Sequence, residues 1–381
     1  MRFLDINRLH STLLQLLLIM TISSCAQTPI VETPPPPPLS NDEIMRNLIN
    51  SKISNSHSET EAMDVFYVTN RELKESNPNC SNKSYGVNPA KGLHYGICKI
   101  NLPKKSRVGK IDATDDPRAD SHSFYRFQSH SSLQPDQVKA AILERKPTSI
   151  LLFIHGFNVK FEEAVMRAAQ ISYDLKYQGL PLVFAWPAGA EDGIASSFIN
   201  KTYEKNYKSA LASQGDATAF IKWLSTLKIP IHLGVHSMGH QVVLPALNKL
   251  SLEVTEPIID ELVLNAPDLA VEDFQKIAPS LKKVAKRITI YCSFNDNAIS
   301  ASETYNSNRR LGACATAEGI DVINVSEVDA PALGLGLGHG YYSSRPIITD
   351  LFQILLGVEA EKRLFIRKSE PNSVENYYLR P

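Results

Sequence analysis

The stretch IHLGVHSMGHQVV, residues 231–243, decides the fold. Its first five residues are apolar enough for a buried strand, and the residues from Met238 onward have the spacing of a helix. Ser237 lies between the two, with Gly239 two positions later, in a pattern close to Gly-x-Ser-x-Gly. That pattern is typical of a nucleophile elbow, a sharp turn that exposes a serine hydroxyl at the edge of a sheet. Val235 stands where the first glycine is usual, so the elbow requires its side chain to point into the core.

The same stretch contains His232, His236 and His240, which raises metal binding as an alternative. Two zinc ligands four residues apart need one helix, and a metalloprotease also needs a glutamate beside the first histidine. Here His232 falls in the strand, His236 at its end and His240 in the helix, so the rings do not share a face. We therefore expect neither a metal nor an organic cofactor.

Short apolar runs recur on both sides of this stretch. A strand that is buried on both faces of a parallel sheet has this appearance, and helix-like segments separate most of the runs. The sequence therefore predicts an α/β fold, with a mostly parallel central sheet flanked by helices on both faces. The predicted strands are 65–70, 94–102, 150–154, 182–186, 231–235, 261–265, 288–293 and 321–325, and the predicted helices are 137–145, 161–177, 209–227 and 238–250.

Two segments lack such periodicity. Residues 103–135 are charged and predict loops. Residues 187–208 are rich in Gly, Ala, Asn and Lys, and predict either an ordinary surface loop or a mobile segment over the site.

The N-terminus is typical of an exported lipoprotein. A basic start and a short apolar stretch lead to Ile22-Ser23-Ser24-Cys25, which resembles a lipoprotein signal that ends at a lipidated cysteine, Cys25. An ordinary signal peptide and an uncleaved anchor are the alternatives. Ala26 follows the cysteine, which in lipoproteins implies lipid anchoring in the outer membrane, facing the periplasm. The expected organisation is a signal peptide (1–24), a Pro-rich and polar linker (25–60), a folded domain (61–360, including N-terminal strands in 61–105) and a C-terminal tail (361–381).

The composition and the remaining cysteines fit that location. The chain is 43% hydrophobic and 21% charged, as in globular proteins, and its formal net charge of zero gives no support for nucleic-acid binding. Four cysteines besides Cys25 suggest disulfides in an exported chain. Proximity favours the pairs Cys80–Cys98 and Cys292–Cys314, and four buried thiols are the alternative.

Residues downstream of Ser237 complete a candidate catalytic set in the chain order nucleophile, acid, histidine. His339, in the loop GLGLGHGYY, is the only histidine after His240. Asp268 and Asp296 each follow a predicted strand, and either can orient the imidazole of a general base.

Upstream, His155 and Gly156 follow the strand 150–154, in an arrangement that resembles an oxyanion loop. The backbone N–H groups of Phe157 and Met238 would then hold a developing oxyanion. For His155 itself we expect a structural role.

Several motifs, in order along the chain, resemble a bacterial family of α/β-hydrolases of unknown function that is grouped with esterases and lipases. They are DVFYVTNR (64–71), YGICKINLP (95–103), LLFIHGFNVKFEEAV (151–165), LVFAWPA (182–188), VHSMGHQVV (235–243), LNAPDL (264–269), YCSFNDNAISAS (291–302) and LGHGYY (337–342). The resemblance covers about 64–357 and implies the α/β-hydrolase fold with a Ser-Asp-His triad. It favours Asp296, which follows the strand where most of these hydrolases carry the acid, over Asp268.

These observations support two hypotheses. The first is a serine hydrolase that cleaves a carboxylic ester, of a small molecule or a lipid, through an acyl-enzyme intermediate. The second is a non-catalytic or weakly catalytic envelope lipoprotein that uses the fold as a binding module, because fold alone does not determine function.

Overall fold

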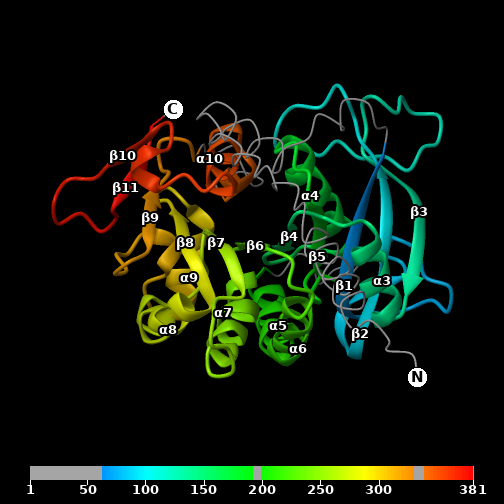
Figure 1. Ribbon diagram of the computed structural model, residues 1–381, viewed down its shortest axis with the longest axis horizontal. Helices are drawn as coiled ribbons and strands as arrows, with labels where there is room; N and C mark the ends of the chain where they lie inside the picture. Colours follow the sequence, from blue (N-terminus) through cyan, green and yellow to red (C-terminus); the bar gives the residue numbers. More distant parts are fainter. Residues whose placement is uncertain (1–61, 192–198, 330–338, 381) are drawn as a thin grey trace, which may run out of the picture. The chain divides into compact units, whose positions relative to one another are not determined.

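The computed structural model describes residues 62–191, 199–329 and 339–380 (Figure 1). The predicted signal peptide, Cys25 and the linker lie outside the described residues, as does the glycine-rich run 334–338 before His339. Among the described helices, none has the length and apolar composition that crossing a bilayer requires.

Within these residues, 11 strands form one sheet in the order β10-β11-β9-β8-β7-β6-β4-β5-β1-β2-β3. Neighbouring strands from β11 to β1 run parallel, whereas the antiparallel pairs lie at the two ends of the sheet. The strands are β1 (Ala62–Leu73), β2 (Tyr85–Asn101), β3 (Arg126–Leu133), β4 (Ile150–Ile154), β5 (Leu180–Phe184), β6 (Ile231–His236), β7 (Ile259–Asn265), β8 (Ala285–Cys292), β9 (Asp321–Asn324), β10 (Ile366–Lys368) and β11 (Tyr377–Leu379).

Helices cover both faces of the sheet (Figure 1). Buried side chains of α3 (Pro135–Glu144), α5 (Ile199–Ala212), α6 (Gln214–Ser225), α7 (Gly239–Leu250) and α8 (Val271–Val284) join one core cluster, and those of α4 (Phe161–Asp174) and α10 (Arg345–Leu355) join the opposite one. Strand β4 contributes Leu152 to the first cluster and Phe153 to the second, as alternation along a strand requires. The remaining helix is α9 (Asn297–Asn306), and the short 3₁₀ turns are η3 (Leu311–Ala313), η4 (Tyr341–Ser343) and η5 (Ala360–Lys362). The predicted fold class is confirmed.

The register of the central strands brings their carboxyl ends to one level. Ile154 of β4 pairs with Val235 of β6, Val235 with Leu264 of β7, and Leu264 with Ile290 of β8. Because these strands are parallel, the loops that follow them meet at one edge of the sheet, where ligands bind in open α/β folds. The residues of the candidate site all follow these strands or lie beside them.

The structure differs from the sequence-based prediction in four segments. Residues 187–208, predicted as a surface loop or a mobile segment, contain most of α5, which begins at Ile199. Residues 103–135, predicted as loops, contain β3, an edge strand without a fully buried side chain and therefore without a clear apolar alternation. The predicted helix 209–227 belongs to two helices, α5 and α6, which meet at Ser213. The hydroxyl of Ser213 donates a hydrogen bond to the carbonyl of Ser209 (2.7 Å). The segment 361–381, described from the sequence as a tail, contributes β10 and β11 to the sheet.

Two disulfides join the cysteines in the pairs that sequence proximity favours. Cys80 is bonded to Cys98, next to the β1–β2 end of the sheet, and Cys292 is bonded to Cys314. The second disulfide lies at the end of β8, so it fixes the strand that leads to Asp296.

Gly234 offers a test of how well the centre of the sheet is packed. A Cβ at this position would meet only the Phe153 ring, at 3.9 Å, so the methyl group of Gly234→Ala has room. Alanine also loses less backbone entropy on folding, so the free energy of unfolding should rise by about 0.5–1 kcal/mol. The measurement is urea unfolding of the purified protein.

Gly179→Ala is the matched control, because its Cβ would lie 2.4 Å from the carbonyl oxygen of Ser149. This variant should be less stable than the wild type. Equal effects of the two substitutions would contradict the packing described here.

Candidate active site

Ser237 lies at a strained turn between β6 and α7. Its φ of 52° is in the left-handed region, which a non-glycine residue adopts only when its surroundings enforce it. The Ser237 N–H donates to the carbonyl of Asn265 in β7 (3.0 Å), and a Cβ on Gly239 would lie 2.5 Å from the carbonyl oxygen of His155. Close contacts on both sides thus hold the turn, and only glycine fits at position 239.

Val235 does not obstruct this turn. Its side chain is fully buried and belongs to the core cluster beneath α7, together with Val242 and Val243. The side chain points into the core, as the elbow requires, so the larger residue at this position is accommodated.

The three histidines of the opening stretch have separate surroundings. The ring of His236 stacks on Tyr342, with centroids 3.9 Å apart, whereas Nδ1–H of His240 donates to the carbonyl of Ser237 (2.6 Å). His232 is buried in β6, 6.4 Å from the ring of Tyr177. In the part of the chain that the structure describes, no cluster of His, Cys, Asp or Glu side chains is arranged to hold a metal ion.

His339 is paired with Asp296. Nδ1 of His339 lies 2.7 Å from Oδ2 of Asp296, whose side chain is fully buried. The other carboxylate oxygen accepts a hydrogen bond from the N–H of Ile299 (3.0 Å), because Asp296 caps the N-terminus of α9. The helix terminus favours a negative charge there, so the carboxylate is fixed in place and can orient the imidazole.

This pair lies beside the elbow. Nε2–H of His236, the residue before Ser237, donates to the carbonyl of His339 (3.3 Å), and the centroids of the two histidine rings are 4.8 Å apart. None of the hydrogen bonds among the described residues joins Oγ of Ser237 to His339, and residues 330–338, which precede His339, lie outside those residues.

Asp268, the second candidate acid, has other partners. Its carboxylate forms a buried ion pair with Arg310 (3.1 Å) and accepts hydrogen bonds from Tyr203 (2.9 Å) and Ser302 (2.5 Å). Its backbone N–H donates to the carbonyl of Ser237 (3.4 Å), so it lies close to the elbow without being bonded to His339. The structure therefore brings Asp296, and not Asp268, to the imidazole.

The expected oxyanion loop also borders the elbow. A Cβ on Gly156 would lie 2.7 Å from Cβ of Ser237, so the backbone of this loop approaches the serine very closely. The N–H groups of Phe157 and Met238 donate none of the loop hydrogen bonds found among the described residues. Two amide groups with free donor capacity beside a serine are what an oxyanion hole requires.

His155 has the structural role expected of it. Its ring stacks on Trp186, and Trp186 donates its indole N–H to the His155 carbonyl (2.8 Å). Burial, together with the nearby charge of Arg71, lowers the pKa of His155 to about 3, so the ring is neutral at physiological pH.

Arg71 is a residue of this region to which the sequence analysis assigned no role. It is fully buried and donates to the carbonyls of Gly86 (3.0 Å), Val159 (2.8 Å) and Ala188 (2.7 Å). Gly86 lies in β2, Val159 in the loop after β4 and Ala188 in the loop after β5, so the guanidinium ties a strand to two loops beside the elbow. The only signal in the sequence is an arginine directly after the apolar strand VFYVTN, and its partners are backbone atoms that no side-chain pattern reveals.

Two features of different character flank the site. A cleft of about 520 Å³ is bordered by His155, Tyr342, Arg167 and the carboxylates Asp115, Glu162 and Glu163. Near the elbow, the rings of Phe157, Tyr203 and Tyr305 follow one another at centroid distances of 5.8 and 4.9 Å. The cleft thus combines acidic side chains with an apolar lining that includes Ile111, Phe153 and Met166, whereas the second feature is aromatic.

A parallel sheet with helices on both faces and a serine elbow at its carboxyl edge defines the α/β-hydrolase class. The family model described as "Alpha/beta hydrolase of unknown function (DUF900)" matches residues 131–358, well over half of the chain. The chain belongs to this family, and the resemblance inferred from its motifs is confirmed.

Other comparisons add little. A structure of esterases from the fungus Rhizomucor miehei is 14% identical, covers 86% of this chain and 92% of that chain, and has a TM-score of 0.29. A mutant of the esterase Est22 is 11% identical, covers 84% and 78%, and has a TM-score of 0.26. Both TM-scores are too low to bear on the fold or the chemistry of this chain. No curated protein matches the chain by sequence.

The buried histidines predict how stability depends on pH. Burial lowers the pKa of His240 to about 3, well below that of an unfolded histidine, so below about pH 6.5 the unfolded chain binds a proton that the folded chain does not. The free energy of unfolding should therefore decrease as the pH falls towards 4, with a contribution from His240 that approaches about 1.4 kcal/mol per pH unit.

In His240→Gln the contribution of His240 to the pH dependence of the free energy of unfolding should disappear. Urea unfolding at several pH values measures this. His122→Gln, a change at an exposed histidine, is the control and should leave the slope unchanged. The same slope in His240→Gln and the wild type would show that His240 is not held neutral in the folded protein.

Proposed function

We propose that this protein is a serine hydrolase that cleaves carboxylic esters through an acyl-enzyme intermediate. The observation that carries the proposal is the His339–Asp296 pair beside the strained turn of Ser237. A serine, an imidazole and a buried carboxylate at the edge of one sheet are the components of nucleophilic acyl transfer.

In the proposed reaction, Oγ of Ser237 attacks the ester carbonyl and its proton passes to Nε2 of His339. Asp296 accepts the Nδ1–H hydrogen bond, which fixes the tautomer and stabilises the imidazolium. The N–H groups of Phe157 and Met238 hold the negative oxygen of the tetrahedral intermediate. His339 then protonates the leaving alkoxide, and a water molecule, activated by the same imidazole, hydrolyses the acyl-enzyme.

The surroundings of the elbow suggest how an ester would bind. The aromatic rings of Phe157, Tyr203 and Tyr305 suit an apolar acyl group. In this proposal the acyl group lies beside them, because the backbone N–H of Phe157 also binds the oxyanion. The substrate is then an ester of a small molecule or a lipid.

We also propose that Cys25 carries a lipid that holds the enzyme at the cell envelope, in the outer membrane and facing the periplasm. The support is the signal-like segment Ile22-Ser23-Ser24-Cys25.

Labelling with a fluorophosphonate probe tests the nucleophile. The wild type should be labelled, because an activated serine attacks phosphorus as it attacks an ester carbonyl. Ser237→Ala should not be labelled, and Ser251→Ala, which changes a buried serine at the end of α7, should react like the wild type. A wild type that stays unlabelled would favour the second hypothesis, a binding module without catalytic activity.

Replacing each candidate acid separates their roles. Asp296→Asn should lower kcat on an activated ester by about 10³–10⁴-fold, because the amide no longer holds the required tautomer of His339. Asp268→Asn should retain most of its kcat but unfold more readily, since it leaves Arg310 buried without its charge partner. Steady-state kinetics and urea unfolding of both variants measure this, and the opposite pattern would assign the acid to Asp268.

The lipid anchor has its own test. Cys25→Ala, or treatment of the cells with globomycin, should change the membrane fraction in which the protein is found and its mobility on a gel. An unchanged distribution and mobility would exclude lipidation at Cys25.

A further inference from the structure

A second buried carboxylate lies close to the proposed triad and has no part in the reaction described above. Asp329 is in the turn that follows β9, and only 4% of its surface is exposed. Its Oδ2 accepts a hydrogen bond from the hydroxyl of Ser293 (2.6 Å), whereas its Oδ1 has no partner among the described residues. A buried carboxylate that is only half satisfied costs stability, which suggests a functional reason for its presence.

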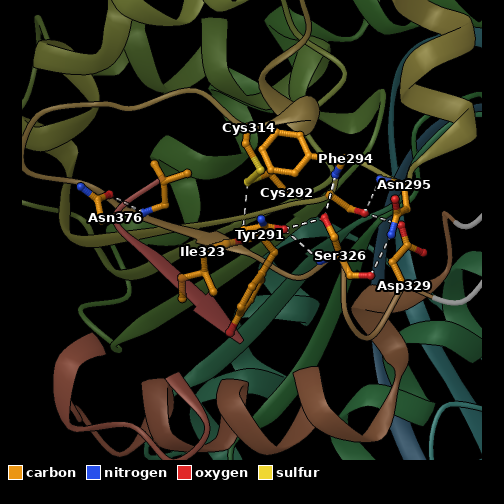
Figure 2. The surroundings of a disulfide bond; sticks show 12 residues. Tyr291, Cys292, Phe294, Asn295, Cys314, Ile323, Ser326, Asp329 and Asn376 are labelled. Carbon is orange, nitrogen blue, oxygen red and sulfur yellow. Dashed lines mark hydrogen bonds between the residues drawn. A yellow bond between two sulfur atoms is a disulfide. The ribbon is translucent and has the colours of Figure 1, made fainter. Parts of the chain in front are cut away.

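The turn that contains Asp329 packs against the loop that leads to Asp296 (Figure 2). The hydroxyl of Ser326 accepts from the N–H of Phe294 (2.9 Å), and the Ser326 carbonyl accepts from the side-chain amide of Asn295 (3.0 Å). Ser293, the partner of Asp329, also accepts from the N–H of Asn295 (3.0 Å). The turn and the loop therefore form one hydrogen-bonded unit.

The Cys292–Cys314 disulfide holds the other side of this loop (Figure 2). The N–H of Ser293 donates to the carbonyl of Gly312 (2.9 Å), two residues before Cys314. Asp329 is thus fixed relative to Asp296 through a short covalent and hydrogen-bonded path.

The titratable groups around Asp329 are Asp296, His339 and Tyr341. Burial and the charge of Asp296 raise the pKa of Asp329, whereas the Ser293 hydrogen bond and His339 lower it, and the net result is a pKa of about 6. Tyr341, in the turn before α10, is buried with a pKa well above its usual range and stays neutral. The carboxylate is therefore mostly ionised at neutral pH, and the imidazole of His339 is among the groups that interact with it.

We propose that Asp329 is a positioning residue of the site: its negative charge stabilises the imidazolium that forms on His339, and its hydrogen bond with Ser293 holds the Asp296 loop. This inference rests on the proposed hydrolase function. Asp329 takes up no proton in the reaction, since the proton moves from Ser237 to His339 and then to the leaving group. Its contribution is the field of a second buried carboxylate, which acts more strongly in the protein interior than it would in water.

The test compares the wild type with Asp329→Asn on p-nitrophenyl butyrate from about pH 5 to about pH 8. At the upper end the ratio of wild-type to variant kcat should be about ten, as expected for the loss of one nearby buried charge. The ratio should fall towards one below about pH 6, where the wild-type carboxyl group is protonated and resembles the amide. A ratio near one throughout, or a larger ratio that does not change with pH, would overturn the proposal.

Ser293→Ala provides a second test that keeps the carboxylate and applies even if Asp329→Asn does not fold. Loss of the hydroxyl removes a hydrogen bond to the ionised form, so the decrease of kcat on the acid side should move to higher pH than in the wild type. An unmoved profile would contradict the proposal. If the wild type neither reacts with a fluorophosphonate nor cleaves the ester, the proposed function fails and this inference fails with it. An active wild type with a flat ratio and an unmoved profile rejects only the role of Asp329.

Discussion

The left-handed backbone of Ser237 is the constraint on which the rest of the site depends. The strands β4, β6 and β7 end at the same level, so the loops that follow them meet around this turn. The hydrogen bond from Ser237 to Asn265 and the close approach of Gly239 to His155 fix the turn from two sides. Such strain is stored where surrounding structure over-determines the backbone, and it is common at catalytic positions.

Around this turn the structure separates neutral from charged groups. His155, His236 and His240 are buried with pKa values below the usual range, so they serve as neutral hydrogen-bonding and stacking groups. His339, in contrast, is partly exposed and bonded to a buried carboxylate. The histidine that is suited to carry a positive charge during a reaction is therefore the one beside Asp296, and the others support the backbone near it.

The sequence predicted the central strands because each is buried on both faces and reads as an unbroken apolar run. It also indicated Ser237, through Gly239 two positions later, and His339, since no other histidine follows His240. It did not reveal β3, whose side chains are half exposed at the sheet edge, or the break at Ser213, where a hydroxyl and not a proline ends the helix. Arg71 and Asp329 were missed for a common reason. Their partners are carbonyls and a hydroxyl from distant segments, which leave no spacing pattern in the sequence.

The most direct measurement of the central claim is a crystal structure of the protein after reaction with a fluorophosphonate ester. The account predicts phosphorus bonded to Oγ of Ser237, with one phosphonyl oxygen about 3 Å from the N–H groups of both Phe157 and Met238. It also predicts Nε2 of His339 within hydrogen-bonding distance of the adduct, with Nδ1 still bonded to Asp296. An adduct on another residue, or an imidazole turned away from Ser237 with its Asp296 bond broken, would contradict the account.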